Sequence, residues 1–264
     1  MKHVVITGSS RGIGFNLAKA FLKRGCRVSI SGRDPERLQK AHHQLVQEFG
    51  NEPVFAKAAD VGDFNQVQAL WDEAFLRFHA IDIWINNAGV TAPPDPLWEQ
   101  NPETVASVYR SNLLGLTYGC MVALTGMRQQ GFGAIYNLEG AGSDGRIHPG
   151  LTLYGTTKFA IRYLTDSIAR EVENTSIIIG ALRPGMVLTD LVTAPYANRP
   201  EDWERFKAVL NLIAERPEIV APRLVDKILQ NQRNGIRIHA YSRLQFIGRT
   251  LIRIALRKRL IEEE

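Results

Sequence analysis

Short apolar stretches alternate with longer segments of helical period along most of this 264-residue chain. The short stretches are rich in β-branched residues and predict strands at 4–7, 27–31, 54–58, 81–85, 134–138, 177–181 and 236–240. The longer segments predict helices at about 12–25, 35–50, 63–78, 101–130 and 152–174. Such alternation is typical of βαβ units around a parallel sheet. Because no repeat or linker interrupts it, we expect a single doubly wound α/β domain.

Two segments depart from this alternation. Residues 188–216 follow the sixth predicted strand and contain the aromatic residues Tyr196, Trp203 and Phe206. Long segments beside the carboxyl ends of strands often cover a ligand, so we interpret 188–216 as a lid, with a packed pair of surface helices as the alternative. The chain then divides into a domain over 1–241 and a tail over 242–264.

Composition and charge fit a globular protein and locate its basic character. Hydrophobic residues make up 45% of the chain, charged residues 22%, and the net charge is +5. Residues 237–264 hold seven basic and three acidic side chains, so the remainder is nearly neutral. A nucleic-acid interface needs basic charge spread along the binding face, and we therefore expect no nucleic-acid partner.

The cysteines and the apolar runs bear on location. Cys26 and Cys120 are too few for a disulfide framework and lie in no metal-ligand spacing, so we expect no metal and a reducing compartment. An apolar run begins at Val4, which leaves no room for a targeting segment before it. No stretch approaches the roughly 20 apolar residues that cross a bilayer. We expect a cytoplasmic protein, or one in another reducing soluble compartment.

A glycine-rich turn joins the first predicted strand to the first predicted helix and reads TGSSRGIG over residues 7–14. Gly8 permits a tight turn, Gly12 lets the backbone approach a pyrophosphate, and Gly14 lets the helix pack closely. The helix amino terminus offers unpaired N–H groups to phosphates. This context predicts a dinucleotide site.

The residues around the second predicted strand indicate which dinucleotide binds. That strand ends Ser31-Gly32-Arg33 without the carboxylate that usually holds the ribose 2′-hydroxyl of NAD. Arg11 in the turn and Arg33 suit a 2′-phosphate, because guanidinium groups offer it charge-assisted hydrogen bonds. We therefore expect NADP(H), with two solvated surface arginines as the alternative.

Further motifs, taken with this turn, resemble the short-chain dehydrogenase/reductase family over residues 3 to about 190. The glycine spacing is similar to that family's TGxxxGxG turn, residues 86–89 to its NNAG element, and residues 154–158 to its YxxxK motif. The resemblance implies a Rossmann-type fold and an NADP-dependent oxidoreductase acting on C=O or CH–OH groups. It also implies a homodimer or homotetramer built on the long helices 101–130 and 152–174.

The resemblance also assigns site residues. Asn112 stands at the family's helix asparagine and would support a water relay, and Lys158 would hold the nicotinamide ribose. The expected cofactor-binding residues are Gly8, Ser10, Arg11, Gly12, Ile13, Gly14, Arg33, Asp60, Val61, Asn87, Ala88, Gly89, Tyr154, Lys158, Pro184, Gly185, Val187 and Thr189.

The chemistry of Tyr154 and Lys158 follows from their spacing. Residues four apart share one face of a helix, so the ammonium should lie beside the phenol. A nearby positive charge favours phenolate and moves the tyrosine pKa toward neutrality. Tyr154 would then donate a proton to a carbonyl oxygen during reduction. An ordinary amphipathic helix face is the alternative.

The serine that polarises the carbonyl is displaced from the common pattern. Most family members place it 12 or 13 residues before the tyrosine, where this chain has Gly142 and Ala141. Ser143 lies nearest, and we assign it the polarising role because a glycine-rich loop could move its hydroxyl. A turn-forming serine beside Asp144 is the alternative.

The string NLEGAGSDGR over 137–146, with YGTTK and PGMVLTD, resembles the chlorophyll b reductase branch of the family. That resemblance implies reduction of the 7-formyl group of chlorophyll b or chlorophyllide b to hydroxymethyl. Tyr196, Trp203, Phe206 and Met186 are candidates to line an apolar site for such a ring, or ordinary core residues. Another lipophilic aldehyde, ketone or alcohol is an alternative substrate, and an NADPH-binding sensor without turnover is a second alternative.

The tail predicts a basic amphipathic helix. Arg249, Arg253 and Arg257 recur every four residues between apolar positions. Such a helix can lie in a membrane interface, which would suit a lipophilic substrate. Docking on the domain or on a neighbouring subunit is the alternative.

Overall fold

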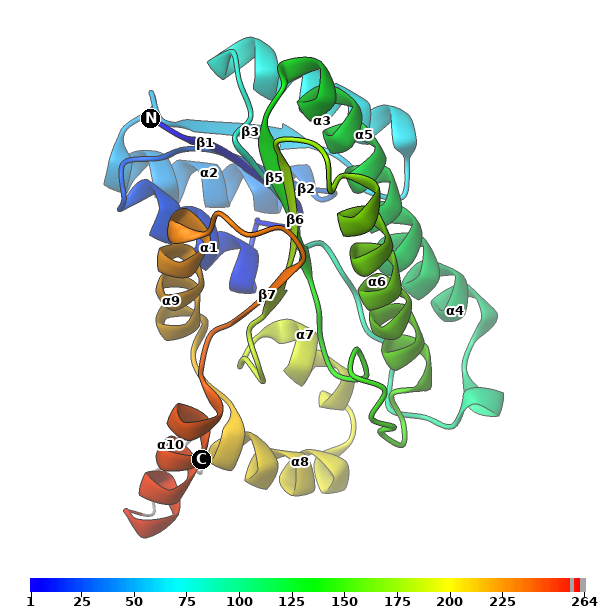
Figure 1. Ribbon diagram of the computed structural model, residues 1–264. Coiled ribbons are helices and arrows are strands. Elements are labelled where there is room, and N and C mark those ends of the chain that lie inside the picture. Colours follow the sequence, from blue (N-terminus) through cyan, green and yellow to red (C-terminus); the bar gives the residue numbers. More distant parts are fainter. Residues whose placement is uncertain (257–258, 262–264) are drawn as a thin grey trace.

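One sheet of seven parallel strands forms the centre of the computed structural model, which describes residues 1–256 and 259–261 (Figure 1). The order across the sheet is β3-β2-β1-β4-β5-β6-β7. The strands are β1 (His3–Ile6), β2 (Arg27–Gly32), β3 (Val54–Ala58), β4 (Ile83–Asn86), β5 (Gly133–Leu138), β6 (Ile177–Arg183) and β7 (Ile236–His239). All the predicted strands are present, which confirms the doubly wound α/β fold.

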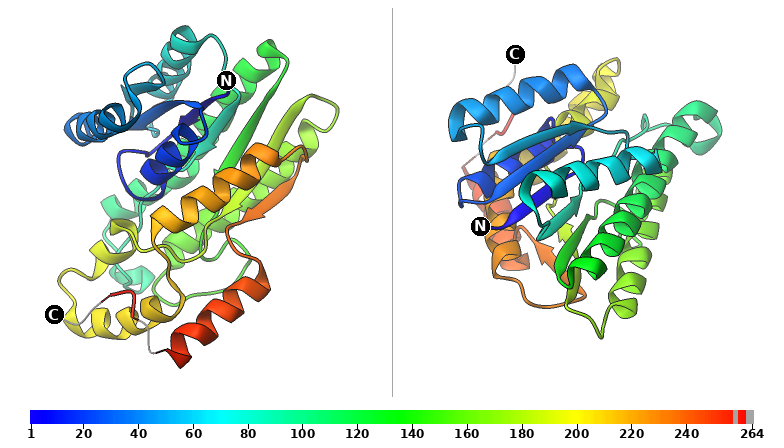
Figure 2. Two further views of the ribbon diagram at one scale, coloured as in Figure 1. Left: turned by 90° about the vertical axis from the view of Figure 1, so that its left-hand side faces the viewer. Right: turned by 90° about the horizontal axis from the view of Figure 1, so that it is seen from above.

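Helices cover both faces of this sheet (Figures 1 and 2). One face carries α1 (Gly12–Leu22), α2 (Pro35–Phe49) and α9 (Pro217–Gln230), and the other carries α3 (Phe64–Phe78), α5 (Gly115–Gln130) and α6 (Thr152–Glu171). Parallel strands are therefore apolar on both sides. In β1, Val4 and Ile6 enter one apolar core and Val5 enters the other.

Two helical regions differ from prediction. The helix expected over 101–130 consists of α4 (Pro102–Tyr109), a π-helical turn η2 (Arg110–Leu114) and α5. Helix α9 was not predicted, because it begins with Pro217 and contains Pro222, and proline disfavours helix interiors. Pro217 occupies the first turn, where its missing N–H costs nothing.

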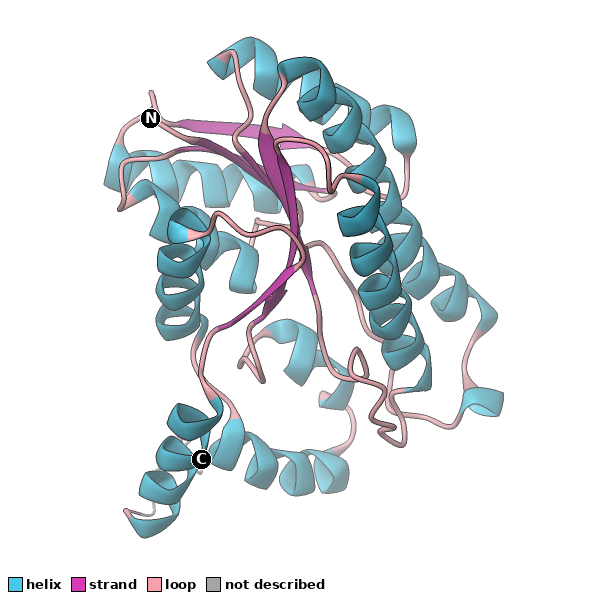
Figure 3. Cartoon of the chain, in the orientation of Figure 1, coloured by secondary structure: helices cyan, strands magenta, loops and turns pink. Residues whose placement is uncertain are grey.

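The carboxyl ends of the strands meet at one edge of the sheet, as Figure 3 shows by the loops that leave it. Strand β1 pairs with both β2 and β4, so the winding of the chain reverses there. In open α/β sheets a ligand crevice forms at such a reversal, outside the carboxyl ends of the strands. The predicted motifs follow β1, β4, β5 and β6, and the fold therefore collects them at this edge.

The predicted lid and tail are both largely helical. The lid contains α7 (Asp190–Thr193), a 3-10 turn η3 (Ala194–Tyr196) and α8 (Pro200–Ile213), and another such turn, η1 (Leu97–Glu99), precedes α4. The tail forms α10 (Arg243–Ala255), which packs beside α8 (Figure 2). Arg257 of the predicted basic stripe lies outside the described residues. Within the described ranges, no helix is long and apolar enough to span a membrane.

Candidate active site

The glycine turn after β1 has the conformation that its sequence predicts. Gly8 and Gly12 have φ angles of +61° and +59°, in the left-handed region that favours glycine. A Cβ on Gly8 would lie 2.6 Å from the Cα of Ala88, and one on Gly14 would lie 2.5 Å from Nδ2 of Asn87. The turn therefore packs directly on the segment that follows β4, and side chains at these positions would separate the two.

Hydrogen bonds from Asn87 and Thr7 hold that contact. Asn87 Nδ2 donates to the carbonyl oxygens of Thr7 at 2.8 Å and Gly8 at 2.9 Å. The Thr7 hydroxyl accepts from the backbone N–H groups of Asn87 at 3.0 Å and Ala88 at 3.1 Å. Sequence reasoning missed this role of Thr7. A hydroxyl residue directly before the first glycine is the signal that could have found it.

The end of β2 lies beside the same turn. The Ser9 hydroxyl donates to Ile6 O at 2.6 Å and accepts from the N–H of Ser31 at 2.9 Å. A Cβ on Gly32 would lie 3.1 Å from the hydroxyl oxygen of Ser10. The hydroxyl of Ser31 is buried and has no hydrogen-bond partner among the described residues. The turn and β2 thus leave a polar group without a partner where a nucleotide ribose is expected.

The two arginines expected at the 2′-phosphate differ in their surroundings. Arg11 pairs with Asp190 at the start of α7, with Nη1 2.6 Å from Oδ2. Arg33 is exposed, and within the described part of the chain no ion pair or hydrogen bond engages its side chain. Arg33 is therefore available to an anion, whereas Arg11 connects the glycine turn to the lid.

The remaining cofactor candidates lie around this crevice. Asp60 accepts a hydrogen bond from the N–H of Gly62 at 2.9 Å, and Val61 packs where a Cβ on Gly115 would collide with it. A Cβ on Gly89 would lie 3.2 Å from Oδ1 of Asn112. These contacts place the segments after β3 and β4 beside the start of α5.

Asn112 lies in the π-helical turn between α4 and α5. Its amide bridges the main chain of Val90, accepting from the N–H at 2.7 Å and donating to the carbonyl at 2.9 Å. It also donates to the hydroxyl of Thr157 on α6 at 3.2 Å. A π turn inserts one residue into a helix and is frequent at functional sites. Here it brings Asn112 against the helix that carries Tyr154 and Lys158.

Tyr154 and Lys158 lie one turn apart on α6, as predicted, but the ammonium does not contact the phenol oxygen. Lys158 Nζ lies 5.5 Å from the centroid of the Tyr154 ring and donates to the carbonyl oxygen of Leu138 at 2.9 Å. Burial raises the pKa of Tyr154 to about 12 and lowers the pKa of Lys158 to about 8. The expected downward shift of the tyrosine pKa is wrong for this structure, because desolvation of the phenolate dominates.

Ser143 is placed differently from expectation. Its hydroxyl donates to Oε2 of Glu139 at 3.3 Å and accepts from Nη2 of Arg183 at 3.3 Å. The residue packed against the Tyr154 hydroxyl is Gly140, where an added Cβ would collide with that oxygen. The glycine-rich loop therefore does not carry the Ser143 hydroxyl to Tyr154, and the polarising role of Ser143 stays a prediction without support from this geometry.

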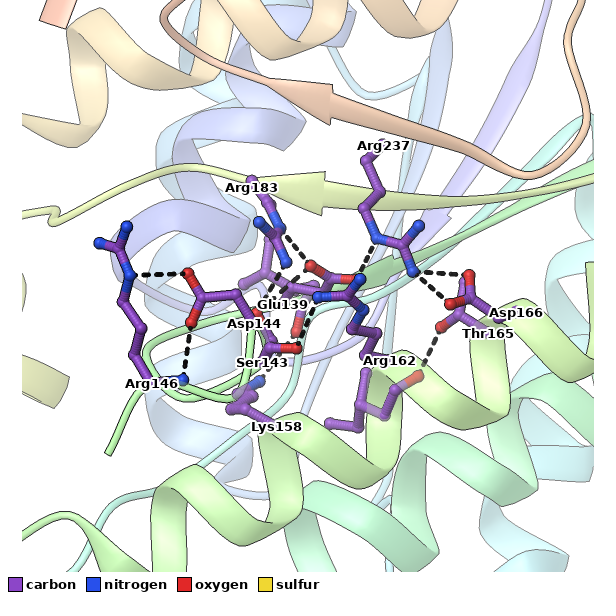
Figure 4. A network of polar contacts seen from close by, with 12 residues as sticks. Glu139, Ser143, Asp144, Arg146, Lys158, Arg162, Thr165, Asp166, Arg183 and Arg237 are labelled. Atoms are coloured by element: carbon purple, nitrogen blue, oxygen red, sulfur yellow. Dashed lines mark hydrogen bonds and ion pairs between the residues drawn. The ribbon is translucent and has the colours of Figure 1, made fainter. Parts of the chain in front are cut away.

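Sequence reasoning also missed Glu139, which follows β5 directly. Its side chain is 0% exposed and forms ion pairs with Arg183 of β6 and Arg237 of β7 (Figure 4). It lies within the string NLEGAGSDGR over 137–146, but no role was assigned to it there. The signal in the sequence is an acidic residue directly after a predicted strand, followed by the small residues Gly140, Ala141 and Gly142.

The lid begins and ends beside the last cofactor candidates. Pro184 and Gly185 follow β6, and Val187 forms a parallel bridge with Glu215 at the end of the lid. Thr189 lies next to Gly12, since a Cβ on Gly12 would come within 3.5 Å of its methyl group. The two ends of the lid are therefore joined to each other, and its first residues lie against the glycine turn.

Aromatic residues of the lid pack on one another. The rings of Tyr196 and Phe206 stack with centroids 4.6 Å apart, and those of Tyr196 and Trp203 lie 6.4 Å apart. Arg199 pairs with Asp95 in the segment after β4. These contacts favour packing within the lid over a fully exposed aromatic lining.

The tail helix docks on the base of the lid. Arg249 Nη1 and Arg253 Nη2 lie 2.9 Å and 3.4 Å from Oε2 of Glu215. Arg249 also donates to the carbonyl of Ile213 at 2.7 Å, and Arg253 donates to the carbonyl of Ala214. These two arginines therefore bind protein, as the docking alternative requires. The apolar side chains of Leu244, Ile247 and Leu251 remain exposed.

Comparisons with known proteins agree with this geometry. A family model described as short chain dehydrogenase matches residues 2–200. The protein named chlorophyll(ide) b reductase NOL, chloroplastic, of Oryza sativa subsp. japonica is 41% identical over 231 residues, or 86% of this chain. The chain spans 66% of the length of that relative. The expected resemblance to this branch is thereby confirmed.

Solved structures share the whole fold. Levodione reductase superposes with a TM-score of 0.81 at 26% identity, covering 90% of this chain and 95% of that chain. An alcohol dehydrogenase from the archaeon Thermococcus sibiricus, complexed with 5-hydroxy-NADP, does so with a TM-score of 0.75 at 26% identity, over the same shares of the two chains. By its matched motifs, fold and relatives, the chain belongs to the short-chain dehydrogenase family.

Proposed function

We propose that this chain is an NADPH-dependent carbonyl reductase that reduces the 7-formyl group of chlorophyll b or chlorophyllide b to hydroxymethyl. The observation that carries the reaction class is the Tyr154–Lys158 pair on α6, at the strand ends where the glycine turn lies. The substrate rests on the 41% identity to a protein named chlorophyll(ide) b reductase. An aldehyde is a suitable acceptor for hydride.

The residues of the crevice fit NADP(H). Gly8 and Gly12 leave the turn open to close approach, and the unpartnered Ser31 hydroxyl offers a group for a ribose. Arg33 would bind the 2′-phosphate, and Asp60 and Val61 would contact the adenine. Bound NADPH supplies the hydride. The nicotinamide end would be held by Asn87, Ala88, Gly89, Tyr154, Lys158, Pro184, Gly185, Val187 and Thr189, and the phosphates by the turn residues Ser10, Arg11, Ile13 and Gly14.

The protein's own residues supply the proton and the charge. With a pKa of about 12, Tyr154 is protonated at neutral pH and can donate to the carbonyl oxygen. A charged Lys158 stabilises the phenolate that forms and holds the ribose. Asn112 joins the main chain of Val90 to α6 through its hydrogen bonds. It would also support the water relay that returns a proton to Tyr154.

A second candidate is favoured by the space beside Tyr154. A narrow hollow lies there, lined by Thr91, Ala92, Leu97, Leu151 and Leu153 among others. It is far smaller than the roughly 300–1,000 Å³ of typical ligand sites. A smaller lipophilic aldehyde or ketone would fit beside Tyr154 with less movement of these surrounding segments than a tetrapyrrole would need.

We also propose a homodimer or homotetramer that uses α5 and α6. Large apolar side chains are exposed there, namely Met121 on α5 and Phe159 and Tyr163 on α6. Contiguous exposed apolar residues are typical of protein interfaces. Sedimentation of the protein should therefore give a mass of two or four times 29.5 kDa, and a mass equal to one chain would contradict the proposal.

The function is tested by mixing the protein with NADPH and chlorophyllide b and following the absorption spectrum. We expect the spectrum of the 7-formyl pigment to give way to that of the hydroxymethyl product. Tyr154→Phe should slow the change by about 10²- to 10⁴-fold, because the proton donor is lost. No spectral change with a preparation that binds NADPH would remove the pigment as substrate, and a variant as fast as the wild type would remove Tyr154 as the acid.

The glycine turn is tested by Gly8→Ala, with Gly25→Ala as its matched control. Both glycines have positive φ, but a Cβ meets Ala88 only at Gly8 and nothing within 4 Å at Gly25. Gly25→Ala should lose about 1 kcal/mol of stability from its positive φ alone, and Gly8→Ala should lose more because its Cβ also collides with Ala88. In a fluorescence titration, only Gly8→Ala should weaken NADPH binding, by about tenfold or more. Equal binding by the two variants would contradict the proposed approach of the turn to the cofactor.

The choice of cofactor is tested by Arg33→Ala. The loss of a charge-assisted hydrogen bond should raise the Kd for NADPH by about tenfold and leave that for NADH unchanged. Arg37→Ala is the matched control, because Arg37 lies on the same segment but pairs with Asp34. If Arg33→Ala changes both cofactors alike, Arg33 does not recognise the 2′-phosphate.

We propose that the exposed apolar face of α10 contacts a membrane surface peripherally, in a reducing compartment. With Arg249 and Arg253 engaged by Glu215, insertion of apolar side chains would provide most of the binding. Ile247→Glu/Leu251→Glu should abolish co-sedimentation with liposomes, whereas Leu76→Glu, at an exposed leucine of α3, should not. Co-sedimentation that survives the double change would contradict this contact.

A further inference from the structure

Glu139, whose own side chain is buried, lies at the centre of a cluster of charges beside α6 whose other members are partly exposed (Figure 4). Arg183 binds its Oε2, and Arg237 Nε lies 3.1 Å from its Oε1. Asp166 of α6 accepts from Nη2 of Arg237 through both carboxylate oxygens, at 2.6 Å each. Arg183 of β6 and Arg237 of β7 therefore hold the carboxylate of Glu139, and Asp166 of α6 in turn holds Arg237.

Stability alone does not explain this cluster. Removing charges from water costs several kcal/mol per ion, and apolar residues of similar volume in the same place often give a protein of equal or greater stability. A carboxylate kept at a 0% exposed position beside an active site therefore calls for a role in the charge balance of that site.

The main chain joins this carboxylate to Lys158. The lysine donates to the carbonyl oxygen of Leu138 at 2.9 Å, and Leu138 directly precedes Glu139. The N–H of Glu139 donates to the carbonyl of Leu182 at 3.0 Å, which extends the β5–β6 ladder by one residue. The acceptor of the ammonium and the nearby carboxylate thus belong to one rigid strand end.

The charge of Glu139 also acts on the lysine. Burial lowers the pKa of Lys158, and the Glu139 carboxylate opposes that shift. The other titratable groups that face the cluster come from every surrounding element: Tyr154, Arg162 and Asp166 from α6, Asp144 and Arg146 from the loop after β5, Arg183 from β6, and Arg237 and His239 from β7. Asp144 lies within reach of Arg146, and Asp166 pairs with Arg237, so both carboxylates have cations of their own.

We propose that Glu139 is a positioning residue for the reaction, whose buried carboxylate, fixed by Arg183 and Arg237, keeps the Lys158 ammonium charged and in place beside Tyr154. The proposal rests on the proposed role of Lys158 in carbonyl reduction. The same proposal explains the unusual position of Ser143. The Ser143 hydroxyl donates a hydrogen bond to the Glu139 carboxylate and accepts one from Arg183, so it helps to hold that carboxylate.

The test is the titration of Lys158 in the full chain without cofactor, followed by NMR of [ε-¹³C]lysine, with Lys158→Arg used to assign the resonance. We expect a midpoint near 8 in the wild type and a fall of about one pH unit in Glu139→Gln, because the counter-charge is removed. Glu139→Asp, which retains the charge, should restore most of the shift.

Asp166→Asn is the matched control, since it removes the other carboxylate on Arg237 and should leave the Lys158 midpoint unchanged. If Glu139→Gln does not fold, Glu139→Gln/Arg183→Gln removes the Arg183 cation together with the carboxylate. Because loss of the Arg183 cation alone raises the Lys158 midpoint, the double variant is compared with Arg183→Gln and should have a lower midpoint than that variant. A folded Glu139→Gln with the wild-type midpoint, or a double variant with the midpoint of Arg183→Gln, would overturn the proposal. Because this titration needs neither NADPH nor pigment, a failure to reduce chlorophyllide b would refute the proposed substrate and leave the result for Glu139 standing.

Discussion

A positive charge buried at the carboxyl end of β5 is the constraint on which the rest of this site depends. Lys158 is 4% exposed, and its ammonium has a carbonyl oxygen of the strand end as its hydrogen-bond acceptor. An ammonium in such surroundings stays charged only if a counter-charge is near. Glu139 supplies it, and the arginines of β6 and β7 hold Glu139 in turn. The three neighbouring strands of the sheet thereby set the position of one side chain on α6.

The second constraint is the close approach of the glycine turn to the segment after β4. The backbone of Gly8 packs directly against the backbone of Ala88. This packing leaves the amino terminus of α1 and the end of β2 open on the same side. Thr7 and Asn87 hold this contact by hydrogen bonds across the point where the winding of the sheet reverses. The crevice proposed for the nucleotide and the helix that carries Tyr154 thus lie at the same edge, as delivery of a hydride and a proton to one carbonyl group requires.

Local patterns allowed much of this to be predicted. Strands rich in valine and isoleucine, the positive-φ glycines and the shared face of Tyr154 and Lys158 depend on neighbours in sequence. The pKa of Tyr154 could not be predicted from such local patterns. It is governed by burial, and burial depends on elements that are distant in the chain. For the same reason the tail arginines could be placed on a helix but not assigned to Glu215, their partner from another segment.

The position of Ser143 shows a different limit. Counting residues back from Tyr154 placed a hydroxyl near the reacting carbonyl, but the loop folds so that Gly140 meets the tyrosine and Ser143 joins the charge cluster. Glu139 lies within the string over 137–146, but that resemblance gave it no role, and its ion pairs with β6 and β7 are the observation that does. Spacing along the chain therefore located the loop correctly but not the direction of its side chains.

The pH dependence of kcat/KM for NADPH-dependent reduction of chlorophyllide b tests the central claim most directly, because it reports the ionisation of groups in the free enzyme. If a charged Lys158 supports proton donation by Tyr154, activity is full below about pH 8 and falls as the pH rises through that value. The phenol itself, with a pKa of about 12, contributes no limb in this range. A profile that stays level from pH 7 to well above the lysine pKa would contradict the account.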